Sequence, residues 1–237
     1  MLVNSLKLVT KEHGSRIAYK TVGKKAISFQ ELDQLSDEVG AWFKVNEVSE
    51  GSVVALCLPS HIEYIISYLA VAKIGGVTAG INPRFTSRER QKVLATLKPD
   101  LVITAAGFDA GVSSEHKSEK IKLNQNINQI MTQQRLTGES LETLETNPDR
   151  PVCICFTSGS TGKPKGAWFT NKQLQAISDL DTGGSWGGGG NRYASTEFAH
   201  VGVMTKLPWL LSSGGTTHLV EKWNAKEILE LIHNYKM

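Results

Sequence analysis

Short, continuously apolar runs alternate along this chain with segments that carry helix-start signals. The run SVVALCLP, at residues 52–59, is followed by VTAGIN at 77–82 and by DLVIT at 100–104. Unbroken apolar runs of this length are typical of strands that are buried on both faces of a parallel sheet. Their alternation with helices predicts an α/β fold, in which strand–helix units form mostly parallel sheets covered by helices.

Four helices are predicted from their N-terminal residues. A Ser, Thr or Asn followed three residues later by Glu can cap a helix, because these side chains bind the backbone N–H groups of the first turn. The pairs are Ser28 with Glu31, Ser60 with Glu63, Thr86 with Glu89, and Asn224 with Glu227. Gly75-Gly76 is the stop signal of the second helix.

A polar stretch at residues 113–147 divides the chain into two α/β parts, residues 1–112 and 148–237. Its Ser, Glu, Lys, Asn and Gln content predicts an irregular or mobile connector, with one short strand near INQIM at 127–131. In the second part we expect strands at 167–169 and 216–220 and helices at 171–180, 200–215 and 224–236. The last helix ends beside Met237 with no strand after it, which predicts a fragment of a longer alternating fold.

Charge and composition exclude several classes of protein. The chain has 26 basic and 23 acidic residues and no Lys/Arg block, so nothing favours nucleic-acid binding. Its most apolar stretch is interrupted by Lys73 and is too short to cross a bilayer, and the N-terminus lacks a signal peptide, so we expect a cytoplasmic protein. Cys57, Cys153 and Cys155 lie in apolar runs and are predicted to be small buried residues, with no metal site.

The segment CFTSGSTGKPKGAW, at residues 155–168, joins backbone freedom, hydroxyl groups and two lysines at the exit of a buried strand. Its glycines let the backbone approach a ligand closely, and successive N–H groups can bind an anion. Neither the GxxxxGK[ST] phosphate loop nor the dinucleotide pattern GxGxxG matches it. The segment therefore predicts a polyphosphate-binding loop of another kind.

The order Thr-Ser-Gly-Ser-Thr-Gly-Lys-Pro-Lys-Gly resembles the signature loop of the adenylate-forming superfamily. This superfamily includes acyl-CoA and aryl-CoA synthetases, firefly luciferase and the adenylation domains of nonribosomal peptide synthetases. Residues 27–43, 69–104 and 198–232 are similar to further blocks of the family, so the resemblance covers nearly the whole chain. It implies a partial N-terminal domain of the adenylate-forming fold, without the family's small C-terminal domain.

The resemblance also implies the roles of individual residues. The phosphates of ATP would be bound by Thr157, Ser158, Gly159, Ser160, Thr161, Gly162, Lys163 and Lys165. His200 lies at the family position beside the acyl pocket. No residue is assigned as catalytic or as a metal ligand, since the family's catalytic lysine would lie beyond the chain end, and Lys236 does not take its place.

Two departures from the family pattern stand out. Thr170-Asn171 replaces the usual Ser/Thr-His pair, so that imidazole is absent. The family's Tyr-Gly-x-Thr-Glu loop and its ribose-binding Asp are also absent. These absences predict that the 237-residue chain is inactive by itself.

The resemblance implies a ligase that activates a carboxylic acid, fatty or aryl, with ATP and Mg²⁺ and passes the acyl group to coenzyme A, as in fatty acid metabolism. Other interpretations stay open. The chain could be an adenylation domain that loads a carrier protein, or an incomplete fragment that binds nucleotide and pairs with a second copy as a homodimer through exposed apolar surface. An unrelated nucleotide-binding module would bind ATP without needing a carboxylic acid.

Overall fold

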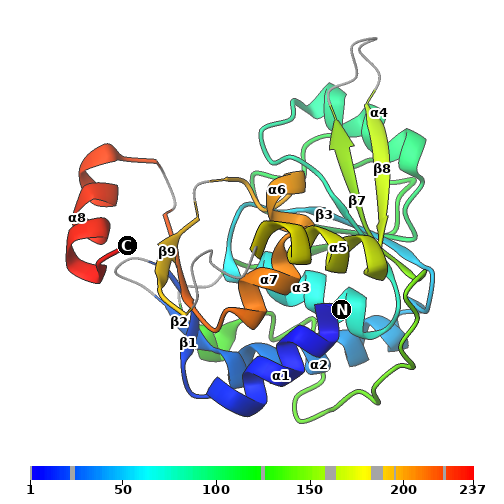
Figure 1. Ribbon diagram of the computed structural model, residues 1–237. Coiled ribbons are helices and arrows are strands. Elements are labelled where there is room, and N and C mark those ends of the chain that lie inside the picture. Colours follow the sequence, from blue (N-terminus) through cyan, green and yellow to red (C-terminus); the bar gives the residue numbers. More distant parts are fainter. Residues whose placement is uncertain are drawn as a thin grey trace.

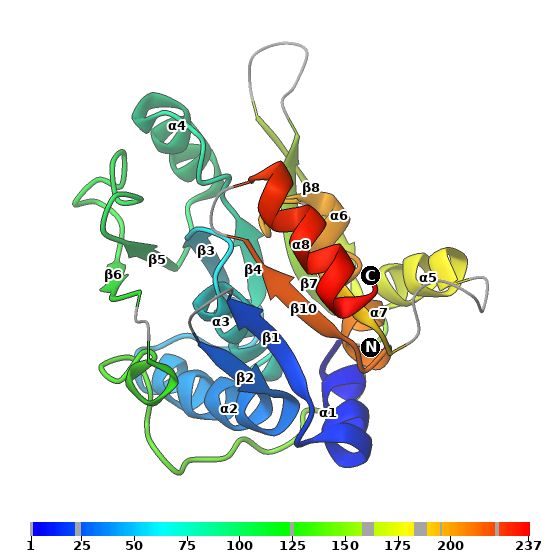
Figure 2. The ribbon, with the colours of Figure 1, turned by 90° about the vertical axis from the view of Figure 1, so that its left-hand side faces the viewer.

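The computed structural model describes residues 2–21, 25–123, 126–157, 164–182, 189–194, 196–220 and 223–237. It contains two sheets with helices between and around them, as Figure 1 and Figure 2 show from two directions. This arrangement confirms the predicted α/β class, with mostly parallel sheets covered by helices.

The larger sheet has six strands in the order β6-β5-β3-β4-β7-β8. All neighbours in it are parallel except β8, which is antiparallel to β7. The strands are β3 (Val53–Cys57), β4 (Val77–Gly80), β5 (Leu101–Ala105), β6 (Ser118–Ile121), β7 (Pro151–Thr157) and β8 (Lys165–Thr170).

The smaller sheet has the order β2-β1-β10-β9 and joins the two ends of the chain. Strand β1 is parallel to β10 and antiparallel to β2, and β10 is parallel to β9. The strands are β1 (Ile17–Thr21), β2 (Ala26–Ser28), β9 (Asn191–Tyr193) and β10 (Thr216–Leu219). The sequence signals did not predict β1, β2, β6 or β9.

The helices form layers around these sheets. They are α1 (Leu2–His13), α2 (Phe29–Val45), α3 (Ile62–Lys73), α4 (Ser87–Leu97), α5 (Asn171–Thr182), α6 (Val201–Met204), α7 (Leu207–Ser212) and α8 (Ala225–Tyr235). Helices α2 and α3 pack together in the core between the sheets, α4 covers the opposite face of the larger sheet, and α8 lies on the smaller sheet (Figure 2). Helix α1 was not predicted from the sequence.

Strand β3 shows why the apolar runs are unbroken. Val54 and Leu56 belong to the main core, which α2 and α3 share, whereas Ala55 and Cys57 belong to a second core against α4. Alternate side chains of a strand point to opposite faces, so a strand covered on both faces needs apolar residues at every position.

Three of the four predicted helix caps are confirmed. Ser28 with Glu31 and Thr86 with Glu89 form complete capping boxes at the starts of α2 and α4. The Asn224 side chain accepts hydrogen bonds from the first turn of α8.

The fourth predicted cap, Ser60 with Glu63, is wrong. Helix α3 begins at Ile62, after His61, and no side chain caps it. The Glu63 carboxylate is instead buried and forms an ion pair with Lys25 at 2.5 Å. The Ser60 hydroxyl donates a hydrogen bond to Glu197, so both side chains are used in tertiary contacts rather than by the local backbone.

Two other expectations also need correction. The segment at 127–131 contains a short 3-10 helix at Ile127–Gln129 and not a strand. The helix predicted at 200–215 is divided into α6 and α7, with Pro208 at the start of α7. Proline has no N–H to continue the hydrogen bonds of the preceding turn, so the helix begins again there.

The predicted connector is held against α2. The backbone N–H of Leu136 donates to the Glu38 carbonyl at 3.0 Å, and the N–H of Gly138 donates to the Glu38 carboxylate at 2.9 Å. Arg135 lies 3.6 Å from the same carboxylate. Between residues 113 and 147, the described part of the connector forms β6 and the 3-10 helix and is otherwise irregular.

No helix in the described part of the chain combines the length and hydropathy that a membrane span requires. The apolar stretch that contains Lys73 is α3, and the lysine is 4% exposed. Its ammonium group donates to the backbone carbonyl of Asp33 at 2.7 Å and to the carboxylates of Asp33 and Asp37 at 2.6 and 2.8 Å. Lys73 therefore joins α3 to α2.

We expect Lys73→Met to lower the free energy of unfolding by about 3 kcal/mol, because two partly buried carboxylates lose their cation. Urea denaturation measures this change. Lys117→Met is the matched control, since Lys117 pairs with Glu47 at the surface and such pairs contribute less than about 1 kcal/mol. Equal losses in the two variants would contradict the structural role of Lys73.

His218 gives the fold a specific dependence on pH. Burial and the nearby Lys20 lower the pKa of His218 from its usual 6.5. As the pH falls through the usual pKa of 6.5, the unfolded chain takes up a proton at this ring before the folded chain does. The free energy of unfolding therefore decreases as the pH decreases. We expect His218→Gln to weaken the loss of unfolding free energy between about pH 7.5 and about pH 5.5, measured by urea denaturation. The exposed His233, changed to Gln, is the control and should keep the wild-type dependence.

Candidate functional site

The carboxyl ends of β3, β4 and β7 meet at one edge of the larger sheet. In open α/β sheets, ligands bind in the crevice outside this edge. The segments that leave it are residues 58–61 after β3, residues 81–86 after β4 and the loop after β7, which contains the predicted phosphate-binding residues. We therefore take this edge as the candidate site.

Strands β7 and β8 are the two sides of the predicted phosphate loop. They form an antiparallel pair in which Thr157 lies opposite Lys165, so the two ends of the loop are neighbours (Figure 1). Lys165 is exposed at the start of β8. Ser158, Gly159, Ser160, Thr161, Gly162 and Lys163 lie outside the described residues. Their assigned roles remain predictions.

The three cysteines are buried, as predicted: Cys57 ends β3, and Cys153 and Cys155 lie in β7 shortly before the loop. Burial raises the pKa of the Cys57 thiol to about 12. The hydrogen bond with Cys153, together with burial, raises the pKa of Cys155. Cys57 and Cys155 therefore stay protonated at neutral pH and are not nucleophiles. The Cys155 sulfur lies 3.8 Å from that of Met204, and this contact packs α6 against β7.

His200 is the residue before α6 and caps it. Its Nδ1 accepts a hydrogen bond from the Gly202 N–H at 3.0 Å, and its own backbone N–H donates to the Glu197 carbonyl at 2.9 Å. An Nδ1 that accepts this bond carries no proton, so the neutral ring holds its proton on Nε2. The side chain is exposed, which leaves that N–H group accessible to a ligand.

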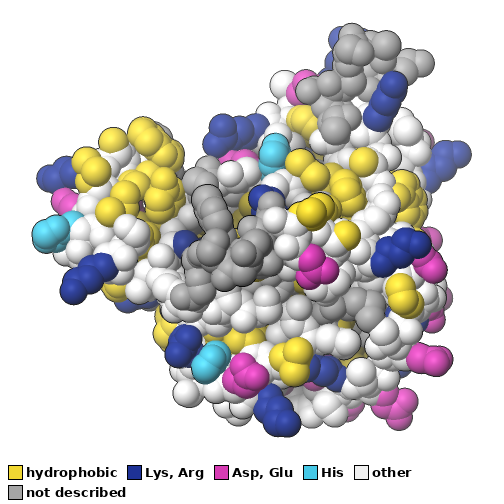
Figure 3. All heavy atoms as spheres, in the orientation of Figure 1, with side chains coloured by type: hydrophobic (Ala, Val, Ile, Leu, Met, Phe, Trp, Pro, Cys, Tyr) yellow, Lys and Arg dark blue, Asp and Glu magenta, His cyan; other side chains and the backbone are white. Residues whose placement is uncertain are grey.

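A cavity of about 730 Å³ lies beside α6 and α7. Aromatic side chains line it, together with Val203 of α6: they are Tyr19, Tyr193, Phe198 and Trp209. His200 is not among the residues that line it, although Phe198 and Gly202, each two residues away, are. Nearby, hydrophobic side chains gather on the surface over α8 (Figure 3), where Leu229 is exposed.

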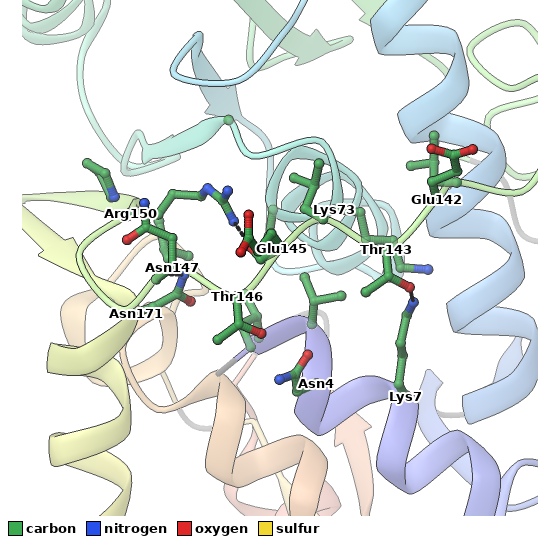
Figure 4. Close-up of a pocket in the computed structure, with 18 of the residues that line it drawn as sticks. Asn4, Lys7, Lys73, Glu142, Thr143, Glu145, Thr146, Asn147, Arg150 and Asn171 are labelled. Atoms are coloured by element: carbon green, nitrogen blue, oxygen red, sulfur yellow. Dashed lines mark hydrogen bonds between the residues drawn. The ribbon is translucent and has the colours of Figure 1, made fainter.

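A second, much smaller cavity of about 40 Å³ lies at the opposite edge of the sheet, among α1, α3 and the connector (Figure 4). Lys7 donates to the Thr143 hydroxyl there, and Arg150 donates to the Glu145 carbonyl at 3.0 Å. This cavity is too small for a nucleotide and lies at the amino ends of β4 and β7, so we assign it no binding role.

Glu197 connects three segments at the candidate site, and sequence reasoning missed it. Its carboxylate accepts a hydrogen bond from Ser60 at 2.7 Å and pairs with Arg84 at 3.0 Å. Ser60 follows β3 and Arg84 follows β4. Ser60 had been assigned to a helix cap, and no local pattern marks Arg84 or Glu197 as partners, because the three residues are far apart in the sequence.

The described residues contain no group of three or more His, Cys, Asp or Glu side chains that could hold a metal ion. The fold and the site together define an α/β protein in which β7 and β8, the strands on either side of a glycine- and hydroxyl-rich sequence, meet at the carboxyl edge of the sheet. Residues 6–237 match the family model described as AMP-binding enzyme. The chain belongs to this family of adenylate-forming enzymes, as its sequence motifs predicted.

Its relatives include both ligases and peptide synthetases. The chain is 24% identical over 230 residues to 4-coumarate–CoA ligase 1 of Petroselinum crispum. This aligned region covers 90% of the chain and 41% of that protein. It is 30% identical over 150 residues to the nonribosomal peptide synthetase imqB of Aspergillus flavus, covering 62% of this chain and 4% of that protein.

The fold is also similar to solved structures. An inhibitor-bound N-terminal domain of FACL13 from Mycobacterium tuberculosis matches with a TM-score of 0.85 and 19% identity, over 98% of this chain and 60% of that one. The chain thus spans less than two thirds of the length of each of these three proteins. The shared architecture confirms the predicted fold of an N-terminal adenylate-forming domain.

We expect the neutral form of the His200 ring to be the Nε2–H tautomer, because Nδ1 accepts a hydrogen bond from the Gly202 N–H. Long-range ¹H–¹⁵N correlation spectra measure the protonation of each ring nitrogen, and a His200→Gln variant assigns the signals. A spectrum typical of the Nδ1–H tautomer would contradict the cap. An unrelated exposed ring such as that of His233 serves as the reference for fast tautomer exchange.

Proposed function

We propose that this chain is the N-terminal portion of the large AMP-binding domain of an acid–thiol ligase. In this proposal, residues 1–112 and 148–237 are its two α/β parts and residues 113–147 connect them. The ligase activates a carboxylic acid, fatty or aryl, with ATP and passes the acyl group to coenzyme A. The observation that carries the proposal is the β7–β8 hairpin at the carboxyl edge of the sheet, within a chain of the AMP-binding enzyme family.

The chemistry has two steps. A carboxylate oxygen attacks the α-phosphorus of ATP, a new oxygen–phosphorus bond forms, and the bond to pyrophosphate breaks. The thiol of coenzyme A then attacks the acyl carbon and AMP leaves. Charge develops on the pyrophosphate in the first step, so hydrogen-bond donors and lysines near it lower the barrier.

We assign the β- and γ-phosphates of ATP to the hairpin loop. The backbone and hydroxyl groups of residues 157–162 would bind them, with Lys165 and Lys163 supplying positive charge. Support for this comes from the place of Lys165, which is opposite Thr157 where the two strands leave the sheet. Magnesium would accompany ATP as its counter-ion. His200 would contact the acid.

A second candidate function is an adenylation domain that passes the acyl group to a carrier protein. The 30% identity to a nonribosomal peptide synthetase favours it. The two functions share the first step and differ in the thiol that accepts the acyl group. Formation of a thioester with coenzyme A, detected by mass spectrometry, distinguishes them.

We expect Lys165→Ala to weaken the binding of ATP about tenfold or more while the binding of AMP changes little, because the lysine would contact phosphates that AMP lacks. Isothermal titration calorimetry measures both affinities. Lys172→Ala is the control, since this exposed lysine of α5 pairs with Asp149 away from the loop. Equal losses for ATP and AMP would contradict the phosphate assignment.

The reaction itself is tested by ATP–pyrophosphate exchange in the longer ligase of which this chain would be the N-terminal portion, because we expect the 237-residue chain to be inactive by itself. Exchange that requires a carboxylic acid supports the proposed function, and 4-coumarate and decanoate serve as aryl and fatty probes. ATP binding without acid-dependent exchange would instead favour a nucleotide-binding module. In an active protein, Lys165→Ala should slow exchange on the order of 100-fold.

A further inference from the structure

The backbone between β9 and α6, residues 196–200, lies close to β4. A Cβ atom at Gly80 would lie 2.4 Å from the Met204 sulfur and 3.1 Å from the Ala199 Cα, so any larger residue there would have to displace these neighbours. Phe198 in the same segment is buried, and its ring packs at 5.8 Å from that of Tyr64 and at 6.3 Å from that of Tyr19. One side of the segment is therefore fixed by packing.

The other side of the segment is fixed by polar contacts. Glu197 accepts from the Ser60 hydroxyl at 2.7 Å, and Ser60 Oγ also accepts from the Phe198 N–H at 2.9 Å. Arg84 donates to the second carboxylate oxygen of Glu197 from both Nε and Nη2, at 3.1 and 3.0 Å. The two carboxylate oxygens are thus divided between the segments that follow β3 and β4.

These contacts lead directly to His200. The Glu197 carbonyl accepts the backbone N–H of His200, and the His200 carbonyl accepts the N–H groups of Val203 and Met204. Displacing Glu197 would therefore displace the start of α6 and the imidazole that caps it. Glu197, Ser60 and Arg84 also line a cleft of about 250 Å³ at this edge of the sheet.

The exposure of Arg84 limits how much its ion pair with Glu197 can contribute to the free energy of unfolding. Its side chain is 79% exposed and that of Glu197 is 28% exposed. Exposed ion pairs contribute little to global stability, because water screens them and the side chains lose entropy. The pair can still select one arrangement of a short segment that is already held on its other side by Phe198.

We propose that Glu197 is a positioning residue that, through Ser60 and Arg84, holds His200 at the start of α6, where His200 would contact the acid. The assignment of His200 to the acid rests on the proposed function. The positioning of His200 by Glu197 does not, since it follows from the contacts alone.

The experiment compares Glu197→Gln and Ser60→Ala with the wild-type chain by ¹H–¹³C spectra of the histidine rings, assigned with His200→Gln. We expect both variants to shift or broaden the His200 signals. The signals of the other histidines should stay in place, except those of His61, which is the chain neighbour of Ser60. Thermal midpoints should fall by no more than about 4 °C for Glu197→Gln. Unchanged His200 signals in both variants would overturn the proposal.

Two further variants keep this result interpretable. Asp109→Asn removes a comparable surface pair, with Lys120 at 2.6 Å, near β6 at the far edge of the same sheet, and should leave the His200 signals unchanged. Ser60→Thr keeps the hydroxyl and should restore signals that Ser60→Ala displaces. Failure of this rescue, or an equal response to Asp109→Asn, would mean that the ring signals report general loosening and would overturn the positioning role.

Steady-state kinetics separately tests whether His200 contacts the carboxylic acid. With 4-coumarate as the probe in ATP–pyrophosphate exchange, Glu197→Gln should raise the KM for the acid about tenfold and change the KM for ATP less than about twofold. A rise in the KM for ATP alone would overturn the acid-side assignment. These kinetics are measured in the longer ligase that would contain this chain. If that protein shows no exchange with any acid, the proposed function fails, and the histidine spectra still decide whether Glu197 positions His200.

Discussion

The burial of β3 and β4 on both faces determines the arrangement of this molecule. A strand covered on both sides needs a helical layer above and below it, and its polar backbone must be satisfied entirely within the sheet. Helix α4 supplies one layer, and α2 and α3 supply the other, which they share with the smaller sheet. Because β3, β4 and β7 are parallel, the segments that follow them all leave the sheet at the same edge, between the two helical layers.

That edge brings together residues from distant parts of the chain. Ser60 and Arg84 follow β3 and β4, the hairpin loop follows β7, and Glu197 precedes α6. The contact between Cys155 and Met204 packs α6 against β7, so His200 is held close to the strand that leads into the loop. In the proposed function, a nucleotide phosphate and a carboxylic acid would meet at this edge.

Polar groups inside this fold serve two different purposes. Lys73 of α3 is buried and pairs with Asp33 and Asp37 of α2, so it fixes how α3 packs on α2. Glu63 of α3 is also buried and pairs with Lys25, directly before β2, so it fixes α3 beside the smaller sheet. Arg84 and Glu197 are more exposed, so their pair contributes little to overall stability and acts on the position of one segment. We therefore expect substitutions of Arg84 and Glu197 to affect the position of this segment more than the stability of the fold.

The sequence by itself determined the features that depend on local rules. Apolar runs predicted β3, β4, β5 and β10, capping residues predicted the starts of α2, α4 and α8, and the order of residues in the hairpin loop predicted the family. Periodicity and capping depend on neighbours in the chain, so they can be read without knowing the fold.

The tertiary structure decided the rest. Ser60 and Glu63 have the spacing of a cap, yet their side chains bind Glu197 and Lys25 instead. The pairing of β1 with β10 and the meeting of Ser60, Arg84 and Glu197 join residues that are far apart in the sequence. No local pattern encodes such contacts, because they exist only after the sheets and helices have packed.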